Sequence, residues 1–179
     1  MKPTYFPELL PTITVVVLSA SSVLADVDGI NVNFDVTDLK TIDQGKAIYA
    51  ENCAACHGDN LEGQDNWKKP DSDDRLPAPP HDENGHTWHH ADDLLFEITK
   101  FGLARMIDDP SYETNMPIYE GVLSDDEITA ALTFIKSTWA GDTKSWNDRV
   151  NLQANEYWVA SPTVKSLDEL QGNVNPDAQ

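Results

Sequence analysis

The pentapeptide Cys53-Ala54-Ala55-Cys56-His57 decides the fold of this chain. It has the form C-x-x-C-H, which is the attachment signature of a c-type haem. The Cys53 and Cys56 thiols can each add to one vinyl group of a porphyrin, and His57 then lies where it can bind the iron. A redox dithiol does not need the histidine and usually occurs in a βαβ pattern, which is absent. A zinc site needs further thiols or suitably spaced histidines. We therefore expect one covalently attached haem c.

The first 25 residues have the pattern of a secretory signal peptide. Lys2 opens the segment, Pro11–Leu24 is mostly apolar, and Val23-Leu24-Ala25 provides small or apolar residues at the cleavage positions. The apolar run is shorter than the roughly 20 residues of a transmembrane helix, so an uncleaved anchor is the less favoured alternative. We expect a mature chain that begins near Asp26, is periplasmic and has no stable membrane span. Because both cysteines are assigned to haem, we expect no structural disulfide.

The chain is strongly acidic, with a formal net charge of −19 at pH 7. Removal of the signal takes away one basic and one acidic side chain, so the mature charge is unchanged. Such a charge repels nucleic acid and favours a redox partner with a basic docking surface. General solubility, or adaptation to a salty habitat, explains the same charge equally well.

Three segments are predicted to be helical. The first runs from Thr41 into Cys53, and its Gly45 is best explained by a second helix that crosses closely. The second is Asp92–Phe101, which has apolar residues at helical spacing and is followed by a helix-ending glycine. The third begins with a capping box at Ser124 and ends near Trp139, with one apolar stripe that we assign to the core.

The remaining segments are predicted to be loops or flanking chain. Residues 58–83 contain several prolines and cannot form one regular element, and residues 103–122 are expected to be loop. Residues 26–40 form an acidic N-terminal segment. Residues 141–179 form a C-terminal extension, with a weak helical pattern over Ser145–Tyr157 and a loose end. We expect its aromatic residues to anchor it on the globule: Trp146, Tyr157 and Trp158.

An electron-carrying haem iron needs a second strong axial ligand on the ring face opposite His57. Met116 is the preferred candidate, because a thioether favours ferrous iron and Pro117 restricts the loop that carries it. Met106 directly follows a predicted helix end and is better explained as a packing residue. The other candidates are His81, His86, His89 and His90.

Three motifs in this order resemble class I cytochromes c: Gly45-x-x-x-Tyr49-x-x-Asn52 running into Cys53–Gly58, then Asn115-Met116-Pro117, then the capped helix ending in Trp139. The resemblance covers about residues 41–140. It implies an all-α fold of three to four helices around one covalently attached haem, with long loops. It also implies thioether bonds from Cys53 and Cys56 and axial ligation by His57 and Met116. In that family a proline carbonyl accepts the ligand histidine's other N–H, and the candidates here are Pro77, Pro79 and Pro80.

The segment His81–His90 holds four histidines and two carboxylates, a composition that copper or zinc can use. We favour a polar loop over the haem edge, with Trp88 packed on the ring or bonded to a propionate. The expected function is single-haem electron transfer with no enzymatic activity. The alternatives are a haem-carrying subunit of a periplasmic oxidoreductase complex, or a haem sensor whose histidine loop binds a metal.

Overall fold

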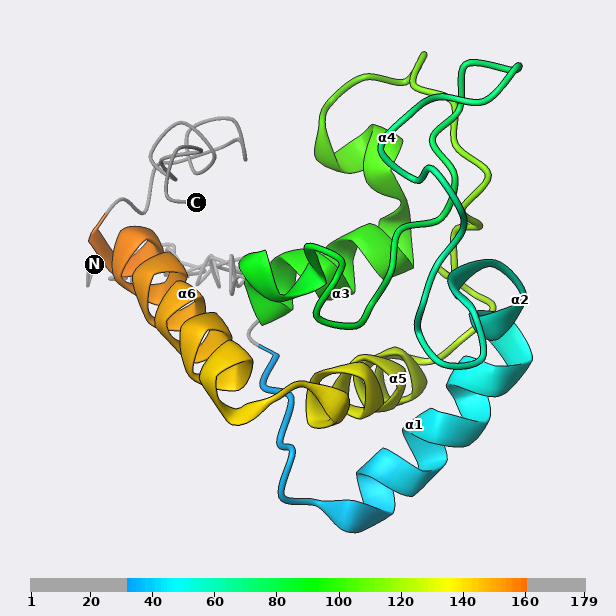
Figure 1. The fold of residues 1–179 in the computed structure, drawn as a ribbon. Coiled ribbons are helices and arrows are strands. Elements are labelled where there is room, and N and C mark those ends of the chain that lie inside the picture. Colours follow the sequence, from blue (N-terminus) through cyan, green and yellow to red (C-terminus); the bar gives the residue numbers. More distant parts are fainter. Residues whose placement is uncertain (1–31, 161–179) are drawn as a thin grey trace, which may run out of the picture.

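The computed structural model describes residues 32–160, and it confirms an all-α architecture, with no strand in that range (Figure 1). The signal peptide expected at residues 1–25 and the loose end at residues 161–179 lie outside the described residues. Within residues 32–160, four helices are longer than two turns, and three shorter elements connect them. In chain order the elements are α1 Leu39–Asn52, α2 Ala54–His57, the 3₁₀ helix η1 Thr87–His89, α3 Asp92–Phe101, α4 Leu103–Met106, α5 Asp125–Thr138 and α6 Gly141–Ala160.

The starts of α1 and α5 are set by side-chain caps. The Asp38 carboxylate accepts the backbone N–H groups of Lys40 and Thr41, so α1 begins two residues before the predicted start. At α5 the predicted capping box is confirmed: the Ser124 hydroxyl accepts the Glu127 N–H, and the Glu127 carboxylate accepts the Ser124 N–H at 2.8 Å. Both caps satisfy N–H groups that a helix start leaves without partners.

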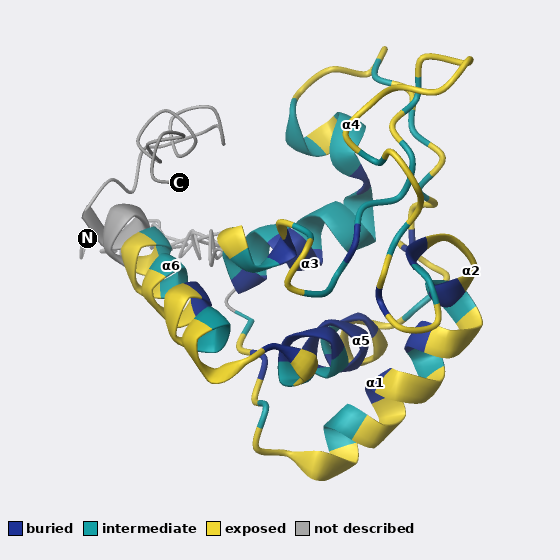
Figure 2. Ribbon diagram, in the orientation of Figure 1, coloured by how far each residue is buried: buried dark blue, intermediate teal, exposed yellow. Residues whose placement is uncertain are grey.

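The predicted close crossing at Gly45 is confirmed, and its partner is α5 (Figure 1). A Cβ on Gly45 would overlap the carbonyl oxygen of Ala130 and approach the Phe134 Cβ to 3.0 Å. One turn later, the Tyr49 ring lies 5.5 Å from the Phe134 ring, between centroids. The facing sides of the two helices are buried, as Figure 2 shows. This contact orients the end of α1, from which the haem motif follows.

Two segments differ from the sequence prediction. Residues 103–122 are not all loop, because α4 forms directly after α3. Gly102 separates the two helices with a φ of +84°, a conformation that L side chains rarely adopt, and it ends α3 as predicted. The C-terminal extension is also more regular than expected, since α6 runs unbroken from Gly141 to Ala160. The side chains of Tyr157 and Trp158 lie outside the described part of the structure, and Trp146 is 38% exposed.

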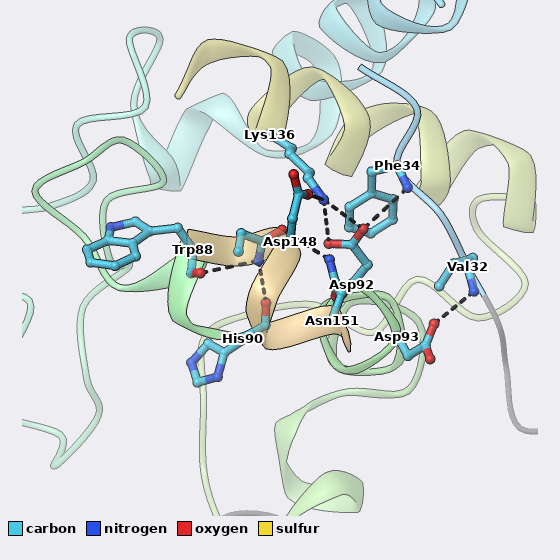
Figure 3. Close-up of polar contacts among 10 residues, drawn as sticks. Val32, Phe34, Trp88, His90, Asp92, Asp93, Lys136, Asp148 and Asn151 are labelled. Atoms are coloured by element: carbon cyan, nitrogen blue, oxygen red, sulfur yellow. Dashed lines mark hydrogen bonds and ion pairs between the residues drawn. The ribbon is translucent and has the colours of Figure 1, made fainter. Parts of the chain in front are cut away.

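Helix α6 is attached through buried polar groups, which explains why hydrophobic periodicity failed to predict its packing. The fully buried Asn147 amide donates to the carbonyl oxygens of Trp88 and His90, at 3.2 and 2.8 Å. One turn further, the Asn151 side chain accepts the Asp92 N–H at the start of α3 (Figure 3). These bonds connect α6 to the η1 loop and to α3.

A buried ion pair lies beside these amides (Figure 3). The Lys136 ammonium of α5 lies 3.0 Å from the Asp92 carboxylate of α3 and 3.3 Å from the Asp148 carboxylate of α6. The Lys136 and Asp92 side chains are 5% and 4% exposed. The backbone N–H of Phe34 donates to the same Asp92 carboxylate. The network therefore joins three helices and the segment that precedes α1.

We predict that Gly45→Ala lowers the free energy of unfolding by about 1–3 kcal/mol, because the new methyl group must push α1 away from α5. Chemical denaturation of the haem-loaded protein would measure this change. Gly141→Ala is the matched control, because a Cβ there meets no atom within 4 Å. Its effect should stay within about 0.5 kcal/mol. Equal stability of the two variants would contradict the close crossing.

We predict that Lys136→Met destabilises the protein by about 3–5 kcal/mol, because it leaves the Asp92 carboxylate buried without its cation. The control is Lys100→Met, which breaks the ion pair with Asp125. The Lys100 side chain is 20% exposed and the Asp125 side chain is 64% exposed. That exposed pair should contribute less than about 1 kcal/mol. Denaturation curves that give both variants the same loss would rule out a special role for the buried pair.

Candidate functional site

The C-x-x-C-H motif lies where α1 ends and α2 forms one further turn. The Cys53 N–H donates to the Tyr49 carbonyl at 2.8 Å, so the first cysteine follows α1 directly. The Cys53 side chain is half-buried and the Cys56 side chain is exposed. Burial raises the pKa of the Cys53 thiol to about 11, against the lowering effect of its Tyr119 contact. The two cysteines and the following His57 lie on one short segment, from the C-cap of α1 to the end of α2.

The His57 side chain is buried, with 7% exposed. Its Nδ1 lies 2.9 Å from the Pro79 carbonyl oxygen. A carbonyl only accepts hydrogen bonds, so Nδ1 carries the proton and Nε2 keeps the lone pair that iron needs. Burial lowers the pKa of His57, and the Pro79 bond partly opposes this shift. Of the three prolines that the sequence left open, the structure selects Pro79.

His81 packs face to face on His57, with ring centroids 4.0 Å apart and planes inclined by 19°. Its Nδ1 lies 2.9 Å from the Thr87 hydroxyl, which donates to the Pro80 carbonyl. Burial holds the pKa of His81 well below its usual range, which favours the neutral form of the ring. A ring stacked on His57 would lie on the same side of a porphyrin bound by His57 as His57 itself. This position does not suit a ligand for the opposite face.

The other three histidines pack with aromatic rings. The His86 ring stacks on Trp67 at 5.2 Å, and the His89 ring stacks on Trp88 at 3.6 Å, between centroids. Burial lowers the pKa of His90 to about 4. Within residues 32–160, no three His, Cys, Asp or Glu side chains converge on a point where a metal ion could bind. The arrangement therefore gives no support to a copper or zinc site in this loop.

The loop that carries Met116 is tied to the haem motif by Tyr119. The Tyr119 hydroxyl donates to the Asn52 carbonyl at 2.6 Å, next to Cys53, and its backbone N–H donates to the Thr99 carbonyl of α3. Met116 itself is half-buried. Sequence reasoning missed Tyr119, because a loop tyrosine gives no sign of which distant carbonyl it will bind. Met106 is half-buried at the end of α4 and lies outside the buried core cluster.

Two further observations test whether these residues fit a haem. The Trp88 indole N–H is buried and has no hydrogen-bond partner, and an orphaned donor of this kind suits an acceptor such as a haem propionate. The Trp139 indole N–H donates to the His81 carbonyl at 2.8 Å, so the end of α5 holds the segment packed against His57. Together with the free Nε2 of His57, the residues fit a covalently held haem.

The chain belongs to the cytochrome c family, because the family model described as Cytochrome c matches residues 42–139, more than half of the chain. This match confirms the resemblance predicted from the sequence. It implies haem-based electron transfer and covalently bound haem c. It also implies that redox proteins are the partners.

A curated relative covers only part of the chain. The Cbb3-type cytochrome c oxidase subunit CcoP of Azospirillum brasilense is 47% identical over 34 residues. The matched stretch is 19% of this chain and 12% of that subunit, so the chain spans a small part of the relative's length. No solved structure matches the chain. In the described range, no helix combines the length and apolar character that crossing a membrane requires.

Proposed function

We propose that this protein is an exported, periplasmic cytochrome that carries one haem c and transfers electrons between redox partner proteins. Cys53 and Cys56 form the thioether bonds, and His57 and Met116 bind the iron. The observation that carries the proposal is the His57–Pro79 hydrogen bond of 2.9 Å, which orients the imidazole and leaves Nε2 as the ligand atom. Residues 41–140 form the haem domain, flanked by segments 26–40 and 141–179.

The protein's part in this function is to hold, orient and shield the cofactor. Haem supplies a one-electron couple at its iron, and no acid, base or nucleophile is required. The Pro79 carbonyl fixes the His57 tautomer, and the hydrogen bond from Tyr119 to Asn52 holds the loop of Met116 beside the attachment motif. The buried Trp88 N–H has no hydrogen-bond partner among the described residues, and we assign it to a propionate. Two strong axial ligands limit the structural change between redox states.

A second function is favoured by the partial match to an oxidase subunit: the protein is the haem-carrying subunit of a periplasmic oxidoreductase complex. The helical extension α6 is then a candidate surface for assembly. Purification from the native periplasm without detergent distinguishes the two functions. A carrier elutes alone with one haem per chain, whereas a subunit elutes with its catalytic partner. Carbon monoxide binding by the reduced protein would instead indicate an open iron position.

We predict that Met116→Ala abolishes the far-red sulfur-to-iron absorption band of the oxidised protein and lowers its reduction potential, because a thioether favours ferrous iron. Absorption spectra and a redox titration measure both effects. Met106→Ala is the matched control and should keep the band and the potential. Loss of the band in Met106→Ala but not in Met116→Ala would transfer the ligand assignment to Met106.

We predict that electron transfer with a basic partner slows steeply as salt rises, because the net charge of −19 steers the encounter. Exposed charges are screened beyond about 8 Å at physiological ionic strength. Stopped-flow rates at several salt concentrations measure this dependence. An acidic partner is the control, because its rate of electron transfer should rise as salt screens the repulsion. Rates that ignore salt would mean that the acidic surface serves solubility alone.

A further inference from the structure

Arg75 connects the two long loops of the protein. It lies in the loop that follows the haem motif, and its guanidinium reaches Glu113 and Asn115 in the loop of Met116. Its Nη2 and Nε atoms lie 2.6 and 3.2 Å from the same Glu113 carboxylate oxygen, Oε2. Its Nη1 donates to the Asn115 side-chain oxygen at 2.9 Å. Asn115 directly precedes Met116, so the contact ends one residue from the proposed iron ligand.

Arg75 is presented by a closed turn. The Asp71 carboxylate accepts the backbone N–H groups of Asp73 and Arg75, at 2.9 and 3.1 Å. The Asp71 N–H donates to the Arg75 carbonyl at 2.9 Å. Four residues further on, the Pro79 carbonyl binds His57. The backbone at Arg75 is therefore held by its own turn, and the turn belongs to the segment that orients the proximal ligand.

The loop of Met116, over residues 110–117, makes few other contacts that hold it in place. The bonds made by Tyr112 and Ser111 to Asp109, and by the Met116 N–H to the Thr114 hydroxyl, are all local. Among the described residues, the hydrogen bonds that join residues 110–117 to other segments all come from Arg75. Tyr119 anchors only the C-terminal end of the loop.

We propose that Arg75 is a positioning residue that holds the Met116 loop closed over the haem iron by binding Glu113 and Asn115 at once. This rests on the proposed ligation of iron by Met116. Three donors in one planar fork restrain both the position and the direction of the loop, which a point charge cannot do. The side chains of Arg75 and Glu113 are 34% and 67% exposed, so the contribution to global stability is small. Its effect is on the local opening of the loop.

Imidazole competition measures that opening. Added imidazole binds ferric iron only in molecules whose Met116 has left, so its apparent dissociation constant varies inversely with the open fraction. The loss of the far-red band reports binding in the intact haem protein. In Arg75→Gln we expect the apparent dissociation constant to fall about two- to fivefold, because the fork is lost and the loop opens more often.

Two variants control for other causes. Arg75→Lys keeps the charge but cannot form the fork, and should fall between the wild type and Arg75→Gln. Arg149→Gln removes the same charge from α6, where the guanidinium lies 5.1 Å from the Trp146 ring centroid, and should bind imidazole as the wild type does. High salt should tighten imidazole binding to the wild type but not to Arg75→Gln, since an exposed pair is screened.

The proposal is overturned if Arg75→Gln binds imidazole as Arg149→Gln does. It is also overturned if the change in imidazole affinity of the double variant Arg75→Gln/Glu113→Gln equals the sum of the changes in the two single variants, because residues that act through one contact are not additive. The Met116→Ala spectrum separates this failure from failure of the ligand assignment. If Met116→Ala loses the far-red band and Arg75→Gln has no effect on imidazole binding, then Met116 remains the assigned ligand and the positioning role of Arg75 is rejected. A band that survives Met116→Ala rejects the ligand assignment itself.

Discussion

The approach of α1 to α5 at Gly45 is the contact on which the remaining structure depends. With no Cβ at this position, the backbone of α1 lies directly against the Ala130 carbonyl, and Tyr49 then packs on Phe134. Dispersion forces and apolar burial both fall off quickly with separation, so a small displacement of one helix would weaken many contacts together. The attachment motif follows α1 directly, and its position is therefore set by the core.

Both long loops are held to this helical frame by hydrogen bonds to backbone carbonyls. Trp139, at the end of α5, binds the His81 carbonyl, and His57 binds the Pro79 carbonyl. On the other side, Tyr119 binds the Asn52 carbonyl. Because these donors are buried or half-buried side chains, each bond carries a penalty if it is left unmade. Loops with few apolar residues thus acquire fixed positions beside the motif.

The parts predicted from sequence are those with local signals. Local sequence predicted three features correctly: the capping box at Ser124, the helix over Asp92–Phe101 and the close crossing at Gly45. Helix caps and hydrophobic periodicity depend on residues that are near one another in the sequence. α4 and the packing of α6 were missed. Helix α4 is a single turn, too short for a periodic pattern. Helix α6 is held by polar side chains such as Asn147, which hydrophobic periodicity does not detect. The choice of Pro79 and the role of Tyr119 depend on loop paths, which local sequence does not determine.

The bond from Asn151 to the start of α3 has a consequence for where the folding unit ends. Ala91, at the N-cap position of α3, has no side chain that can cap the helix. The Asn151 amide oxygen accepts the Asp92 N–H instead, across 59 residues of sequence. The helix thus takes its cap from a segment that lies beyond the family match at residues 42–139. Evolution can trim or replace a C-terminal appendage freely only when the domain does not use it. Here the appendage completes a helix of the domain, so the two have to change together.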